Sequence, residues 1–166
     1  MGEFTTRLVI QATNFSATFE KIGYLGLKNI LEKNDINYTK FTIVQASQVK
    51  VEWEILNWKG NEVTIASIDA VAIYPSIKFT LVKKAISYFT RNLPKSQQPT
   101  VKLCLKLIAF GMSSTLLKFE EKYYEYGEKG IKTKGLAIGG YESAFLADLV
   151  ASYLFKKCNN QFKEVL

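Results

Sequence analysis

An aspartate at the end of an apolar segment is the residue of this chain best placed to do chemistry. Asp69 ends the segment 62–71, whose apolar residues fall on both faces and predict a central, buried strand. Magnesium prefers hard oxygen ligands on a rigid element, and it serves enzymes that transfer phosphoryl groups. Asp69 is therefore a candidate metal ligand. The alternative is an ordinary strand-end aspartate that caps a turn.

Two further groups could form a substrate pocket with this aspartate. Tyr74 follows it by five residues, so its ring could contact a sugar or belong to the core. Farther along, Gly139 and Gly140 form a turn that opens an apolar helix, and Ser143 follows the turn. Glycine lets the backbone approach a ligand closely. A helix entered through a glycine turn is also common without any ligand.

The segments 68–77 and 135–149, in this order and with a helical stretch between them, resemble motifs A and B of reverse transcriptases. The Tyr-Pro-Ser-Ile string also resembles family B DNA polymerases, but the Asn-Ser-x-Tyr-Gly string of that family is absent. The resemblance implies an RNA-directed DNA polymerase that uses Mg²⁺ or Mn²⁺, an RNA or DNA template–primer and deoxynucleoside triphosphates. The residues it assigns are Asp69 (catalytic, metal ligand), Tyr74 (sugar gate), and Gly139, Gly140 and Ser143 (nucleotide and template pocket).

Two weaker similarities extend the resemblance. Arg7 opens the string Arg-Leu-Val-Ile, which resembles a fingers motif whose arginine contacts the triphosphate. The segment 122–135 resembles the hairpin before motif B in Penelope-like reverse transcriptases, where Lys132 and Lys134 would contact template phosphates. The alternative for these lysines is a solvated face. The main departure from the family is a Gly-Tyr pair where Ser-Pro usually follows the first glycine of motif B.

Apolar periodicity places these residues on a helix-rich framework. The predicted elements are helices at 16–33, 77–93 and 101–119, strands at 7–12 and 62–71, a hairpin at 122–134 and a last helix after Gly140. The predicted fold class is α+β, a helix-rich partial polymerase palm and fingers with a small antiparallel sheet. Residues 1–6 resemble a cloning remnant or a disordered start, and residues 7–166 a single fingers–palm-like domain, incomplete at its C-terminus.

Composition narrows the function classes. Of the 166 residues 48% are hydrophobic and none is histidine, which indicates a folded chain and excludes zinc fingers and Ser-His-Asp triads. The net charge of +7 favours a polyanionic partner. Cys104 and Cys158 lie in apolar helical contexts and are predicted to be free buried thiols. No apolar run reaches the roughly 18 residues of a membrane span, so we expect no membrane association and an intracellular location.

The sequence also lacks part of the expected metal site. No Tyr-x-Asp-Asp string and no Asp-Asp pair occurs, although in-line phosphoryl transfer uses two metal ions. We therefore expect a reverse transcriptase fragment that is inactive alone, with a homodimer covering the open edge of strand 62–71. Two alternatives stay open. One is a non-catalytic nucleic-acid-binding module derived from a polymerase palm, and the other is a structural protein whose motif matches are accidental.

Overall fold

The structure is a computed structural model that describes most of the predicted helices. The described residues are 15–39, 47, 50, 51, 54, 72–114, 116–119, 122–125 and 135–162. The predictions that fall outside them are Asp69, Arg7, Lys132, Lys134, the strands at 7–12 and 62–71, and the dimer edge. These stay predictions.

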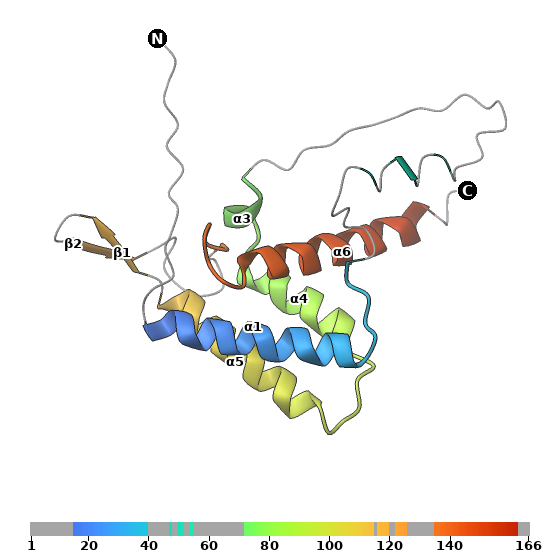
Figure 1. The fold of residues 1–166 in the computed structure, drawn as a ribbon, viewed down its shortest axis with the longest axis horizontal. Helices are drawn as coiled ribbons and strands as arrows, with labels where there is room; N and C mark the ends of the chain where they lie inside the picture. Colours follow the sequence, from blue (N-terminus) through green and yellow to red (C-terminus); the bar gives the residue numbers. More distant parts are fainter. Residues whose placement is uncertain are drawn as a thin grey trace, which may run out of the picture.

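Helices build the described part of the molecule (Figure 1). The elements are α1 (Phe15–Lys33), α3 (Ile73–Ser76), α4 (Phe79–Thr90), α5 (Gln98–Ser113), β1 (Leu116–Phe119), β2 (Lys122–Glu125) and α6 (Ser143–Phe162). α5 packs against α1 along one side and touches α4 on another, while α6 packs across α4 and contacts the short α3. The helices therefore enclose one shared core.

The α1–α5 contact depends on two glycines of α1. A Cβ added at Gly23 would lie 2.8 Å from the carbonyl oxygen of Cys104, and one added at Gly26 would lie 2.9 Å from Cys104 Sγ. Close-packed interiors do not accommodate such approaches without a backbone shift. These glycines therefore set how near the two helices come.

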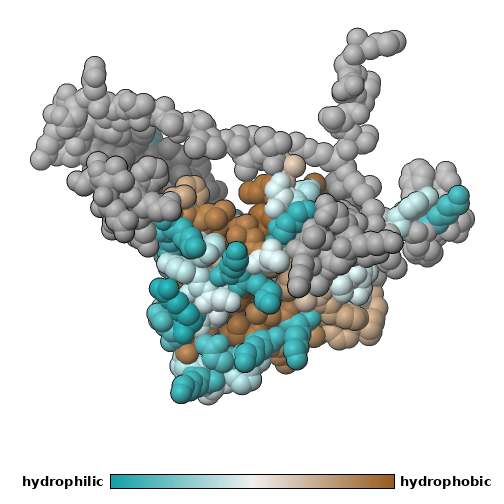
Figure 2. Space-filling view, turned by 180° about the vertical axis from the view of Figure 1, so that it is seen from behind, coloured by the Kyte–Doolittle hydropathy of each residue, from teal (hydrophilic) through white to brown (hydrophobic). Residues whose placement is uncertain are grey.

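The α4–α6 contact is apolar. Both helices place large side chains on one face at helical spacing. The buried apolar residues of the two helices are Phe79, Val82, Ala85, Ile86 and Phe89 in α4, and Phe145, Leu146, Ala147, Leu149, Val150 and Tyr153 in α6. Burying such a side chain contributes about 1.5–3 kcal/mol. Seen from behind, hydrophobic side chains show in the middle and on the right of the helical unit, and hydrophilic ones gather on its left and lower sides (Figure 2).

The segment after α1 is attached to α6. The Ser152 hydroxyl donates a hydrogen bond to the carbonyl oxygen of Tyr38. The Tyr38 ring meets Phe145 edge to face, with ring centroids 5.3 Å apart. The side chain of Asn34, directly after α1, donates to Gln97 Oε1 at 2.9 Å. Polar contacts thus attach the segment after α1 both to α6 and to the residue before α5.

The predicted α+β class is wrong for the described residues, which are predominantly helical. Their only pairing of strands is the antiparallel ribbon of β1 and β2, which lies outside the group of helices (Figure 1). Residues 122–125 pair with 116–119, which sequence analysis did not predict as a strand, and the predicted pairing of 122–126 with 131–134 lies outside the described residues. The ribbon covers no face of the helical core, so it does not make the layer that an α+β fold requires.

Two local predictions also need correction. The helix predicted to run to residue 119 ends at Ser113, where Ser114 N–H bonds the carbonyls of Phe110 and Gly111 in a tightened last turn. Glycine followed by serines has low helix propensity, which favours an end here. Cys104 is buried as predicted, whereas Cys158 is exposed. The predicted helices at 16–33 and after Gly140 are confirmed by α1 and α6.

Candidate functional site

Two segments that the motif analysis singled out meet in space. The Leu136 N–H donates a hydrogen bond to the carbonyl oxygen of Tyr74 at 2.9 Å. Beside it, Lys78 and Gly135 form an antiparallel bridge. A Cβ at Gly135 would collide with Pro75, whose carbonyl carbon would be 2.6 Å away. Only glycine allows the two backbones to cross so closely.

Tyr74 is held by a sharp turn in its own segment. Ala72 precedes α3 in the left-handed conformation, with φ 48° and ψ 50°. This conformation costs a residue with a side chain about 1 kcal/mol or more. The Tyr74 ring is half-buried and packs against the hydrophobic core. The strained turn therefore redirects the chain just before the ring predicted to act as the sugar gate.

The glycine turn before α6 has the backbone geometry that its sequence suggested. Gly139 is exposed and has φ 95°, a region that glycine adopts readily. Gly140 N–H bonds the carbonyl of Ala137 at 3.2 Å, and Ser143 N–H bonds the carbonyl of Gly140 at 3.3 Å. The backbone of Gly139 is therefore exposed to solvent in a turn that these hydrogen bonds hold. Ser143 is buried, and its hydroxyl donates to Glu142 Oε1 at 3.5 Å.

A pair of buried carboxylic acids lies behind this turn, and sequence analysis missed it. Glu20 of α1 is 5% exposed and Glu142 is 1% exposed. The two carboxyl groups lie close enough that Glu142, through its charge and a hydrogen bond, raises the pKa of Glu20. Since neither carboxylate has a proton to donate, such a bond requires one of the two groups to be protonated. Glu142 Oε2 is buried and has no hydrogen-bond donor among the described residues.

Burial controls the protonation of the pair. Removal from water, the charge of Glu142 and a hydrogen bond to it together raise the pKa of Glu20 from 4.5 to about 8, and burial contributes most. Burial also raises the pKa of Glu142, against hydrogen bonds from its own backbone, Glu20 and Ser143 that lower it. Glu142 precedes the first turn of α6, where the helix dipole favours a negative charge. We therefore assign the shared proton to Glu20 at neutral pH.

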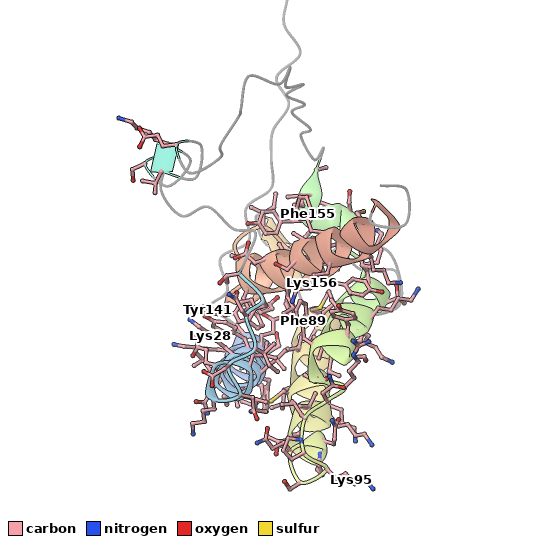
Figure 3. The ribbon with its side chains drawn as sticks, turned by 90° about the vertical axis from the view of Figure 1, so that its right-hand side faces the viewer. Lys28, Phe89, Lys95, Tyr141, Phe155 and Lys156 are labelled. Atoms are coloured by element: carbon pink, nitrogen blue, oxygen red, sulfur yellow. The ribbon has the colours of Figure 1, made fainter. Side chains whose placement is uncertain are left out.

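Two features position the pair. A Cβ at Gly111 of α5 would overlap Glu20, with Oε1 of the carboxyl 2.7 Å away. A Cβ at Gly140 would lie 3.0 Å from Glu142 Oε1. The nearby cation of α1, Lys21, is exposed and lies over the Tyr141 ring at 5.3 Å from its centroid. Figure 3 shows Tyr141 at the side of the molecule that α1 occupies.

Of the predicted site, the described residues join Tyr74 to Leu136, which precedes the turn of Gly139, Gly140 and Ser143 in the chain. Asp69, Arg7, Lys132 and Lys134 lie outside them. Within the described ranges, no group of three or more histidine, cysteine, aspartate or glutamate side chains gathers as metal ligands do. No helix in the same ranges has the length and apolar character needed to cross a membrane.

No protein-family model matches the chain, and neither a curated protein nor a solved structure does so. The similarity to reverse transcriptases therefore depends on the motif residues themselves. The junction of Tyr74 with Leu136 is the structural observation that bears on it.

Proposed function

We propose that this chain is part of an RNA-directed DNA polymerase and contributes residues that contact the incoming nucleotide and its template. The junction of the Tyr74 segment with the segment that leads into Gly139 supports this proposal. These two segments are far apart in the sequence, and a hydrogen bond and a backbone crossing at Gly135 join them. A nucleotide pocket made from motifs A and B requires the two motifs to be neighbours.

In this proposal, each described residue has a binding or positioning role. The half-buried Tyr74 ring would lie against the sugar and exclude a 2′-hydroxyl group. Gly139, exposed at φ 95°, would let the backbone approach the nascent base pair. Strain at Ala72 and packing in the core fix these groups before the ligand arrives, which reduces the entropic cost of binding.

The metal site of the proposal depends on Asp69. Mg²⁺ or Mn²⁺, when bound, would neutralise phosphate charge during phosphoryl transfer. One aspartate does not hold two ions, and the described residues contain no other gathered set of metal ligands. The isolated chain is accordingly expected to bind nucleotide weakly and to extend no primer.

Photocrosslinking tests this proposal without requiring catalysis. A photoreactive dUTP analogue would be irradiated with the chain, Mn²⁺ and an oligo(dT) primer on poly(rA). We expect label in peptides that contain Tyr74 or Gly139, and less label from the matching ribonucleotide. Tyr74→Ala should remove the preference for the deoxynucleotide and Tyr74→Phe should keep it, because the gate needs the ring and not the hydroxyl group.

Tyr124→Ala is the matched control, because Tyr124 is an exposed tyrosine of β2. Label spread over the whole chain, or an unchanged preference in Tyr74→Ala, would contradict the proposal. Primer extension would be measured in parallel on Asp69→Ala. Extension by the chain that the variant loses would refute the expected inactivity while supporting the polymerase class.

Non-catalytic nucleic-acid binding is the second candidate function. The net charge of +7 and the lysines on the outer faces of α4 and α6 favour it. It requires neither Asp69 nor a metal ion. Binding that depends steeply on salt and is unchanged in Asp69→Ala would distinguish it from the first candidate.

A further inference from the structure

A groove lies between α4 and α6, and the junction at Leu136 contributes no residue to its lining. Its volume is about 550 Å³, and it is open to solvent. The residues of its lining that carry the argument are Lys83, Lys84, Ser87, Tyr88, Tyr153 and Lys157. None of the described residues that line it is acidic.

Helical spacing explains why cations gather there. Lys84 and Tyr88 are four residues apart on α4, as are Tyr153 and Lys157 on α6, so each pair occupies one face of its helix. The apolar contact between the helices turns the lysines outward. Lys83, Lys84 and Lys157 are exposed. The groove therefore has a positive rim that no carboxylate in its lining neutralises.

Aromatic rings form the floor of the groove. The rings of Tyr88 and Tyr153 have centroids 5.4 Å apart. Arg91 lies over Tyr88 at 4.7 Å and Lys157 over Tyr153 at 5.2 Å, measured to the ring centroids. Such cation–π contacts hold the charged groups beside flat apolar surface.

The contact continues along α6 beyond the groove. Lys156 lies 4.8 Å from the centroid of Phe89 on α4. Figure 3 shows these two residues where α6 crosses α4. A negatively charged strand that follows this crossing would meet cations on both helices.

We propose that this groove binds single-stranded nucleic acid, with a base against Tyr88 and phosphates on Lys83, Lys84 and Lys157. Proteins commonly bind single strands in positively charged grooves that contain aromatic side chains. The bases stack on the aromatic rings, and the cations bind the phosphate groups of the backbone. A duplex keeps its bases stacked inside and offers only phosphates. The volume lies within the roughly 300–1,000 Å³ of small-ligand pockets, which suits a short stretch of one strand.

The groove does not depend on the polymerase proposal, because it shares no residue with the Tyr74 and Gly139 pocket. Fluorescence anisotropy with an eight-nucleotide oligo(dU) or oligo(U) tests it directly. The triple variant Lys83→Gln, Lys84→Gln, Lys157→Gln should bind at least about 10-fold more weakly. Its log–log salt slope should be lower by about 2, since single strands release roughly 0.7 counterions per contact.

The matched control removes the same number of positive charges outside the groove. Lys95, Lys102 and Lys106 are exposed and lie outside the groove, so the triple change to glutamine should weaken binding less than about 2-fold. Tyr88→Ala should weaken binding about 5-fold or more through lost stacking, and Tyr88→Phe should restore it. The lysine variants change only the surface, so their result does not depend on tolerance of the Tyr88 changes.

Three outcomes would overturn the proposal. Equal losses in both lysine triples would mean that the overall charge of the protein attracts the strand. If the chain bound a hairpin duplex as tightly as the single strand, stacking of bases on Tyr88 would not contribute to binding. Stronger binding to phosphatidylserine vesicles than to the oligonucleotide, lost in the groove triple, would assign the groove to a lipid surface. Photocrosslinking at Tyr74 would be unaffected by any of these results, so the two proposals fail separately.

Discussion

The acid pair and the groove between α4 and α6 differ in how far their charged side chains are buried. The carboxyl groups of Glu20 and Glu142 are almost wholly out of water, and burial raises the pKa of both. The groove between α4 and α6 keeps its lysines in water and buries only the rings beneath them. Burial therefore makes the acid pair sensitive to pH, whereas the exposed groove should respond to ionic strength.

The largest expected effect that would test this contrast is the pH dependence of stability. The pKa of Glu20 is higher in the folded state, about 8, than the ordinary 4.5. The folded state therefore holds the proton more tightly. The resulting stabilisation is complete below about pH 4.5 and is lost as the pH rises through about 8. We expect the free energy of unfolding to fall by about 3 kcal/mol between pH 5 and pH 9.

Urea unfolding of Glu20→Gln measures this contribution. Glutamine keeps a hydrogen-bond donor toward Glu142 and removes the titration, so most of the fall between pH 5 and pH 9 should disappear. Glu32→Gln is the control, because Glu32 is exposed and pairs with Lys28 at 3.8 Å on the surface of α1. A pH dependence in Glu20→Gln equal to that of the unaltered chain would show that the pair shares no proton.

A smaller effect is expected from Gly111→Ala. The added methyl group would displace the buried Glu20 side chain, and overpacking of this kind costs about 1–3 kcal/mol, partly offset by the better helix propensity of alanine. Thermal unfolding should show a net loss of about 1 kcal/mol. In a chain that already carries Glu20→Ser, Gly111→Ala should lower the free energy of unfolding by less, because the added methyl group no longer meets the Glu20 side chain. Additive losses would place Glu20 away from Gly111.

The smallest effect is expected at the groove. The triple change of Lys83, Lys84 and Lys157 to glutamine should alter the free energy of unfolding by less than about 0.5 kcal/mol, because exposed charges contribute little to stability. The urea midpoint should be nearly the same at pH 5 and pH 9 as in the unaltered chain. A large loss of stability would mean that the lysines support the fold, and the contrast between the two regions would fail.

Apolar periodicity predicted the extent of α1 correctly but does not by itself identify its buried face. Ile22 and Leu25 are apolar yet exposed. The buried face carries Glu20 and Gly23 beside the apolar Leu27. Gly23 could have signalled it, since a mid-helix glycine often marks close packing.

The acid pair itself could not have been predicted by pattern. Glu20 and Glu142 lie far apart in the sequence, and each looks like an ordinary surface residue, because glutamate is rarely buried. Strand β1 was missed for a related reason. Its four residues had been assigned to the end of a long apolar helix, because periodicity alone does not separate a short apolar strand from a helical segment.

The close approach of α1 and α5 has a consequence for the speed of folding. The two helices meet only after the whole stretch from Lys33 to Gln98 has closed into a loop, and the entropy of that closure is lost before the contact stabilises anything. Chains with such distant contacts fold more slowly than bundles whose neighbouring helices pack in sequence order. The docking of α1 onto α5 should therefore be a late event, and Gly23 and Gly26 should affect the rate of unfolding more than the rate of folding.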